Sequence, residues 1–161
     1  MPTQQEVEVL VNEIQPGKIY QVKDSDSRTL CIDNKGWAGW YWARLKRNPA
    51  GDQIARVSFE ARPGGKFRMK QHMQHPDNRG LMLFSRYATD DAAVCFAQPE
   101  YEKDHFHLEL TPVTSGEFIT FTAEVNGESF QLAFQSSGDD TGLVISKSST
   151  RQLKIKVHPT N

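Results

Sequence analysis

A short phrase occurs three times in this chain and decides the expected fold. It reads Glu13-Ile-Gln-Pro-Gly-Lys-Ile19, then Glu60-Ala-Arg-Pro-Gly-Gly-Lys-Phe67, then Glu109-Leu-Thr-Pro-Val-Thr-Ser-Gly-Glu-Phe118. Each copy ends one alternating apolar run, turns at Pro and Gly, and begins another run. The copies start at residues 13, 60 and 109, so the intervals between them are 47 and 49 residues. Near-equal intervals that almost fill the 161 residues indicate an internal repeat.

Each interval holds four short apolar or alternating runs, separated by clusters of turn-forming residues. Thr29-Leu-Cys-Ile32, for example, precedes the polar cluster Asp33-Asn-Lys-Gly36, and Asn126-Gly127 precedes the apolar run at residues 129–134. The Asn-Gly pair is a strong hairpin signal because both residues accept a positive φ angle. Helical periodicity does not extend over ten residues anywhere. The sequence therefore predicts an all-β barrel or sandwich.

Three four-stranded units of just under fifty residues resemble the β-trefoil superfamily, in which six strands close a barrel and three hairpins cap it. The resemblance implies a single domain over residues 1–161, with units at about 14–60, 61–109 and 110–161. The alternative is a β-sandwich or jelly roll, since residues 121–130 look like a strand pair of a galectin. The chain has neither a galectin's His-x-Asn-x-Arg motif nor its Trp-Gly-x-Glu motif, so the β-trefoil is favoured.

β-Trefoils are mostly binding proteins: lectins, cytokines, Kunitz and mycocypin protease inhibitors, and fascin-like actin bundlers. Ricin-B-type lectins carry Gln-x-Trp in each repeat, which this chain does not. The segment 20–34, followed by Ala38-Gly39, is similar to the opening strands of interleukin-one-like cytokines. The third unit has no clear match to that family's Phe-Glu-Ser…Pro-Gly-Trp-Phe signature. The superfamily resemblance implies binding without catalysis, through loops.

The composition is that of a globular protein, with 37% hydrophobic and 24% charged residues and a net charge of −1. The charges are unevenly distributed, because segment 44–86 has ten Lys or Arg against three acids, whereas segment 90–140 has eleven acids against one base. Arg68 and Lys70 alternate with apolar residues and share a strand face. We expect strands from the two segments to lie side by side so that the signs interleave, and we expect no nucleic-acid partner.

Cellular location is constrained by three sequence features. Cys31 and Cys95 lie in apolar runs, which indicates buried thiols in a reducing compartment. Residues 1–13 do not resemble a secretory leader, and no apolar run approaches the ~20 residues of a membrane helix. These features predict a chain without a membrane span that is cytoplasmic or secreted without a leader.

Catalytic and metal-binding signatures are missing. There is no Gly-x-Ser-x-Gly elbow and no Gly-rich loop that opens a helix to cradle phosphate. The acidic pairs at 90–91 and 139–140 fall in turns, where Asp is expected for turn geometry alone. His105 and His107 could face one metal ion, but no third ligand has the right spacing, and solvent-facing imidazoles are expected. The sequence predicts no enzymatic activity, metal or cofactor.

The aromatic run Trp37-Ala-Gly-Trp-Tyr-Trp42 contains all three tryptophans. Alignment with the other units places Trp40 and Trp42 in the core, and Trp37 and Tyr41 outside it. Trp37 follows the predicted turn that contains Asp33 and Asn34. An exposed indole can stack on a sugar face while carboxylate and amide groups bind its hydroxyls.

The equivalent turns supply further candidates for this carbohydrate site: Tyr87 with Asp90 and Asp91 in the second unit, and Asp139 with Asp140 in the third. The sequence therefore favours a lectin-like protein that binds a glycan or glycoprotein. The alternative is a protein-binding trefoil, cytokine-like or inhibitor-like, that acts through loops such as residues 44–52 or 72–80.

Overall fold

The computed structural model of the chain describes residues 13–37, 40–72, 80–99, 105–137, 140–148 and 150–160. These residues include a short 3₁₀ helix, η3 (Gly51–Gln53), and a series of strands. The strands are β1 (Tyr20–Asp24), β2 (Thr29–Trp37), β3 (Trp40–Lys46), β4 (Val57–Arg62), β5 (Lys66–Gln71), β6 (Met82–Ser85), β7 (Val94–Ala97), β8 (Phe106–His107), β9 (Glu109–Ser115), β10 (Phe118–Val125), β11 (Glu128–Ser137), β12 (Asp140–Ser146) and β13 (Ile155–Pro159). Within the described ranges, no helix is long and apolar enough to cross a membrane.

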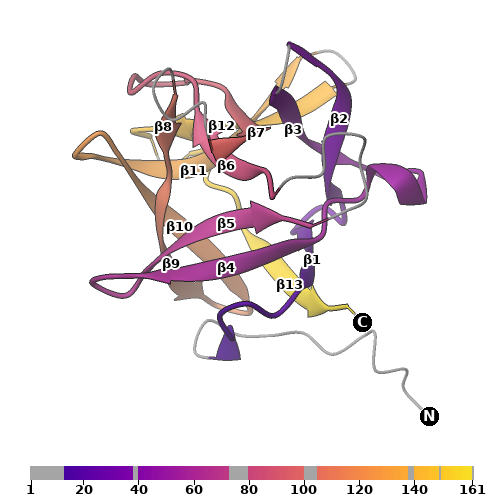
Figure 1. Ribbon diagram of the computed structural model, residues 1–161, viewed down its shortest axis with the longest axis horizontal. Helices are drawn as coiled ribbons and strands as arrows, with labels where there is room; N and C mark the ends of the chain where they lie inside the picture. Colours follow the sequence, from indigo (N-terminus) through magenta and orange to yellow (C-terminus); the bar gives the residue numbers. More distant parts are fainter. Residues whose placement is uncertain are drawn as a thin grey trace.

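Six strands close into a barrel in the order β1, β4, β5, β9, β10, β13 and back to β1 (Figure 1). Two of these contacts are hairpins, β4–β5 and β9–β10. The others are long-range pairings: β5 meets β9 at Phe67↔Leu110, β10 meets β13 at Ile119↔Ile155, and β1 pairs with both β13 and β4. The closed ring leaves these strands without a free edge.

Three hairpins, β2–β3, β6–β7 and β11–β12, cap this barrel. Each hairpin contacts the other two: β3 pairs with β7, Gly142 of β12 pairs with Arg44 of β3, and an isolated bridge joins Ala93 to Val144. A six-stranded barrel closed by three mutually contacting hairpins is the β-trefoil. The sequence-based fold prediction is therefore confirmed, and the sandwich alternative is excluded.

The barrel interior is filled by every second side chain of its strands, as a half-buried sheet requires. The ring centroid of Phe59 lies 5.9 Å from that of Phe121 and 6.1 Å from that of Tyr20, and all three side chains are fully buried. Tyr41, expected outside the core, is 8% exposed and belongs to it, whereas Trp42 is half-buried against a smaller cluster. The expected alternation was wrong by one residue, because Tyr41 shares the buried face of β3 with Ala43 and Leu45, whereas Trp42 lies on the opposite face.

The repeated phrase lies where one unit gives way to the next. Its second copy forms the β4–β5 hairpin, whose tip uses Gly64 and Gly65 at φ +80° and +75°. The third copy forms the β9–β10 hairpin, which turns at Gly116 with φ +62°. Here Pro112 is paired with Phe121 inside β9, so the predicted turn at this proline was wrong. The glycine, which tolerates the left-handed conformation, sets the turn.

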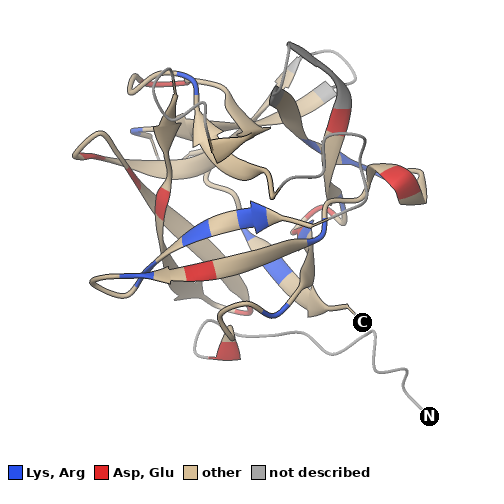
Figure 2. Ribbon diagram, viewed as in Figure 1, with Lys and Arg blue, Asp and Glu red and all other residues tan. Residues whose placement is uncertain are grey.

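The positive and negative segments interleave on folding, as expected, and they do so around the β4–β5 hairpin (Figure 2). Glu109 of β9 pairs with both Arg68, at 2.7 Å, and Arg62, at 3.5 Å. Lys66 pairs with Glu124 of β10, and Lys70 lies 3.7 Å from Glu60. Two acids of segment 90–140 therefore neutralise three cations of segment 44–86, whereas Lys70 pairs with an acid of its own segment.

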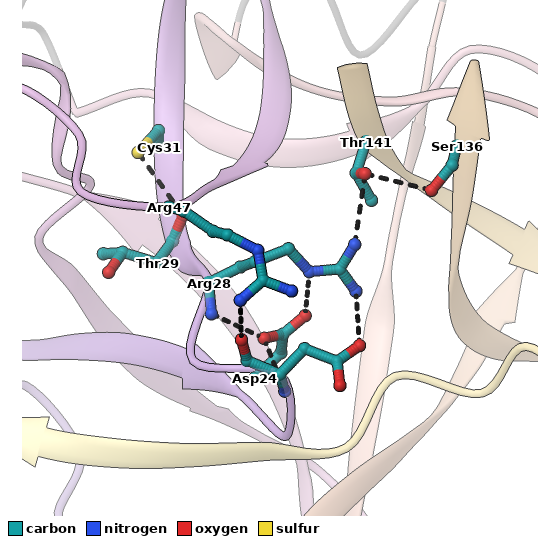
Figure 3. A network of polar contacts seen from close by, with 8 residues as sticks. Asp24, Arg28, Thr29, Cys31, Arg47, Ser136 and Thr141 are labelled. Atoms are coloured by element: carbon teal, nitrogen blue, oxygen red, sulfur yellow. Dashed lines mark hydrogen bonds and ion pairs between the residues drawn. The ribbon is translucent and has the colours of Figure 1, made fainter. Parts of the chain in front are cut away.

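The turn between β1 and β2 connects the first unit to the third (Figure 3). The Asp24 carboxylate accepts hydrogen bonds from the backbone N–H groups of Asp26 and Arg28 and from Arg28 Nε, which lies 2.7 Å from Oδ2. Arg28 Nη1 also donates to Thr141 Oγ1 at 3.1 Å, and its guanidinium lies 5.0 Å from the Phe134 ring centroid. One arginine therefore organises its own turn and contacts two strands, β11 and β12.

Candidate functional site

The predicted turn at residues 33–36 is part of strand β2. Ile32 pairs with Ala43 and Gly36 pairs with Tyr41, so β2 carries two more residues than β3 between these pairs. This is a β-bulge, and the chain reverses only after Trp37, which pairs with Trp40. The turn prediction was wrong because strand pairing accommodates the polar residues as a bulge, despite their turn propensity.

Asp33 is the member of the predicted indole site whose side chain the structure describes; those of Asn34 and Trp37 lie outside it. Asp33 Oδ2 lies 3.6 Å from Arg44 Nε, and both side chains are largely buried. The Arg44 guanidinium is 5.3 Å from the Trp42 ring centroid. A Cβ atom at Gly142 would come within 3.1 Å of Arg44 Nη1, so glycine provides the space for this arginine. Asp33 thus belongs to an ion pair at the junction with the third unit.

Tyr87 is exposed, as the predicted carbohydrate site requires. It lies in the connection between β6 and β7, and 54% of the residue is accessible to solvent. The Arg86 guanidinium lies 5.2 Å from its ring centroid, and the Ser85 hydroxyl donates a hydrogen bond to the Tyr87 carbonyl at 2.7 Å. The ring is therefore held at the surface with one face against a cation.

Asp90 and Asp91, from the same connection, bind the third unit. Asp90 Oδ1 accepts a hydrogen bond from the backbone N–H of Lys147 at 2.8 Å. Asp91 adopts φ +63°, donates its N–H to the Ile145 carbonyl, and pairs its carboxylate with Arg151. Both carboxylates therefore join units two and three.

The third pair of predicted residues is described only in part. Asp139 lies outside the described residues, and Asp140 begins β12, paired with Ser137, with its side chain also outside them. The structure thus distributes the predicted residues over three hairpins. Asp33 contacts Arg44, whereas Asp90 and Asp91 contact the segment after β12.

Two exposed loops were not among the predicted site residues, although one overlaps the segment 44–52 considered for a protein-binding trefoil. In this loop Arg47 is exposed and donates from Nη1 to the Asp26 carbonyl at 2.8 Å. Asn48 takes φ +47°, and a bridge between Ile54 and Cys31 fixes the end of the loop. The segment is exposed but anchored on both sides.

The β4–β5 tip is the second such loop. Residues 62–65 are exposed, and the tip projects beyond the adjoining barrel strands (Figure 1). Arg62 pairs with Lys66 across the hairpin, and ion pairs to Glu109 and Glu124 hold these two residues. The sequence signal for this loop is the repeated phrase itself, which predicts a turn between units but does not indicate a binding loop.

The histidines have structural neighbours. His72 Nε2 lies 2.7 Å from Ser58 Oγ, and burial, with help from the nearby Lys70 charge, lowers the pKa of His72. His105 and His107 pack against Phe84, with ring centroids at 6.3 and 4.3 Å. The expectation that these two imidazoles face solvent was wrong, since Phe84 covers them. No group of three metal-ligating side chains occurs in the part of the chain that the structure describes.

Both cysteines are buried free thiols, as predicted. Burial raises the pKa of Cys31 to about 11 and that of Cys95 to about 12. A nucleophilic cysteine needs the thiolate, so neither residue has the environment of a reactive thiol.

Comparison with known proteins finds solved structures with a similar backbone. No protein-family model and no curated protein sequence matches the chain. A trypsin inhibitor from soybean is 14% identical, with a TM-score of 0.70 over 96% of this chain and 100% of that one. A Kunitz type trypsin inhibitor from Cicer arietinum is 13% identical, with a TM-score of 0.64 over 99% and 100% of the two chains.

The double-headed arrowhead protease inhibitor A, solved in complex with two trypsins, is 9% identical to this chain. Its TM-score is 0.65, over 96% of this chain and 95% of that one. At such identities the similarity extends to the backbone and not to particular side chains. These likenesses show that the chain adopts the β-trefoil fold of the Kunitz-type inhibitors.

Proposed function

We propose that this chain is a non-enzymatic, protein-binding β-trefoil that inhibits a protease through an exposed loop. The observation that carries the proposal is the pair of anchored loops, each of which presents an arginine. Similar solved structures described as trypsin inhibitors, one of them in complex with two trypsins, support the same function.

An inhibitor gains affinity when its contact loop is already ordered, because binding then costs less conformational entropy. The loop at residues 47–52 meets this condition through the bridge between Ile54 and Cys31 and the hydrogen bond from Ala55 N to the Leu30 carbonyl at 3.0 Å, neither of which involves Arg47. The β4–β5 tip meets it through hairpin pairing and the ion pair between Lys66 and Glu124.

Arginine also suits one class of target. Trypsin-like proteases have an anionic specificity pocket that accepts a basic side chain. Arg47 is exposed, and the Arg62 side chain is 40% exposed. Either can enter such a pocket without rearrangement of the barrel by exchanging its contact with the Asp26 carbonyl or with Glu109 for the acid of the pocket. We infer that the target protease cleaves after basic residues.

Inhibition assays test this function directly. The folded chain is titrated against trypsin, chymotrypsin and papain, and the inhibition constants of Arg47→Ala and Arg62→Ala are compared with that of Lys147→Ala. Lys147 is an exposed cation outside both loops. Loss of a central contact costs about 2 kcal/mol, or roughly thirtyfold, so one arginine variant should weaken inhibition of trypsin by that factor. Folded protein that inhibits none of the three proteases would contradict the proposal.

Carbohydrate binding is the second candidate function, and the exposed Tyr87 ring favours it. An aromatic ring at the surface beside Asp90 can stack on a sugar while the carboxylate accepts a hydroxyl. A glycan array decides between the candidates. Hits lost in Tyr87→Ala and Trp37→Ala, without any protease inhibition by the parent chain, would favour the lectin.

A further inference from the structure

The outer face of strands β1 and β13 carries like charges opposite each other. Tyr20, Val22, Ile155 and Val157 are buried in the barrel, so the alternate residues of both strands point outward. In the antiparallel register one of these outward pairs is Lys23 opposite Lys156. Like charges directly opposite each other destabilise a sheet.

More cations surround this pair. Lys154 is exposed and continues the outward alternation of β13, with its carbonyl accepting a hydrogen bond from Ser25 N at 2.9 Å. Arg56 is exposed and immediately precedes Val57, the residue that pairs β4 with β1. We name Lys23, Arg56, Lys154 and Lys156 the basic face, of which the β13 part is visible in Figure 2.

The basic face differs from the β4–β5 hairpin, where acids from β9 and β10 balance the cations. Lys23, Arg56 and Lys154 form no ion pair with another described residue. Lys156 lies 3.8 Å from Glu117, its ammonium is 5.0 Å from the Phe118 ring centroid, and its side chain is 22% exposed. The other three cations of the basic face have no acidic partner among the described residues, and this excess of positive charge indicates a role for the charge itself.

We propose that the basic face binds a sulfated polysaccharide. Strand geometry places Lys154 and Lys156 about 7 Å apart along β13 and Lys23 about 5 Å away across the sheet. Cations in this array can contact successive sulfate groups of one linear chain. The barrel has no free edge, so a peptide cannot add to it as a further strand, and recognition depends on side-chain charge.

Other polyanions fit this surface less well. Binding of single-stranded nucleic acid adds base stacking on aromatic side chains to the charge attraction, and attachment to a membrane adds insertion of exposed apolar side chains. The large hydrophobic residues exposed in the described part of the chain are Tyr87 and Val113. Neither lies on β1 or β13, since Tyr87 is in the β6–β7 connection and Val113 is on β9.

Binding to immobilised heparin tests the proposal. The variant Lys23→Gln/Lys156→Gln is compared with Arg62→Gln/Lys66→Gln, which removes the same charge from the β4–β5 tip. We expect the parent and the control to be retained at 150 mM NaCl and the basic-face variant to bind at least tenfold more weakly. Equal losses in both variants, or a parent that is not retained, would overturn the proposal.

Two further arms make the assignment specific. Single-stranded poly(dT) and vesicles of phosphatidylserine and phosphatidylcholine replace heparin, and desulfated heparin serves as the negative control. Parent binding to poly(dT) or vesicles as tight as to heparin would refute the assignment to sulfated polysaccharide. Thermal unfolding provides a readout independent of ligand: removing the opposed charges in Lys23→Gln should raise Tm by about 1–3 °C, whereas a fall would refute the like-charge strain.

Discussion

Arg28 Nη1 donates a hydrogen bond to Thr141 Oγ1 at 3.1 Å and so joins the first unit of the trefoil to the third. The same guanidinium pairs with Asp24, whose side chain is only 2% exposed. In Arg28→Met, the buried carboxylate keeps its two backbone donors but loses its counter-charge. We expect a loss of about 2–3 kcal/mol in the free energy of unfolding, measured by urea denaturation.

Thr141→Val is the control for this change, because it removes the hydrogen bonds of Thr141 Oγ1 to Arg28 and to Ser136 and leaves the ion pair with Asp24. Its expected cost is about 1 kcal/mol. An Arg28→Met variant no less stable than Thr141→Val would show that the ion pair contributes nothing.

The hairpin between β10 and β11 offers a backbone test. Asn126 and Gly127 adopt φ +50° and +80°, and Val125 pairs with Glu128 on either side. A Cβ atom at Gly127 would meet nothing within 4 Å, so Gly127→Ala costs only the strain of a left-handed alanine, about 1 kcal/mol. Gly51 also has open space and no positive φ, and Gly51→Ala should change stability by less than about 0.5 kcal/mol. Equal unfolding midpoints for the two variants would contradict this account.

Local patterns in the sequence predicted the architecture well, because the fold repeats them. The Asn126-Gly127 pair accepts positive φ at both positions, and a glycine of each copy of the phrase also takes positive φ, so both mark turns without tertiary information. The interleaving of Arg68 with Glu109 was also expected, since an uneven charge distribution in a closed barrel brings the two signs together. Errors arose where partners distant in sequence decide the structure.

Tyr41 shows such an error, because it lies on the face of β3, with Ala43 and Leu45, that packs into a core made of residues distant in sequence. The same limit affects the candidate site. Asp33 was assigned to a turn for its residue type, but β3 holds it in a bulge beside Arg44. The sequence predicts a loop around Arg47 but not its anchor. The anchor is the Asp26 backbone carbonyl, and a backbone group cannot be recognised from the residue type.

The pair formed by Ser58 and His72 predicts a pH dependence of stability. The folded pKa of His72 lies below its ordinary value, so the unfolded chain takes up a proton first as the pH falls. The contribution of this histidine is fully present above about pH 6.5 and decreases as the pH falls through the folded pKa. Urea denaturation between pH 7.5 and 5.0 should show a shallower decline in His72→Gln than in the parent. Parallel curves would show that His72 does not contribute.

The two thiols provide a test of the core. With pKa values of about 11 for Cys31 and about 12 for Cys95, at most about one thousandth of either is thiolate at pH 8. Both are also fully buried, so a disulfide reagent has neither a nucleophile nor access. We expect the native chain to react only as fast as it unfolds, and the chain in guanidinium chloride to titrate two thiols at once.

The direction of the shift also fixes the effect of alkaline pH. Because both pKa values are raised above 9.0, the protonated thiols stabilise the fold fully below about pH 9, and this contribution is lost as the pH rises toward 11 and 12. In the assay with the disulfide reagent, the variants Cys31→Ala and Cys95→Ala show which of the two thiols has reacted. Rapid modification of one thiol in the native chain at pH 8, lost in the corresponding variant, would show that this part of the core opens to solvent.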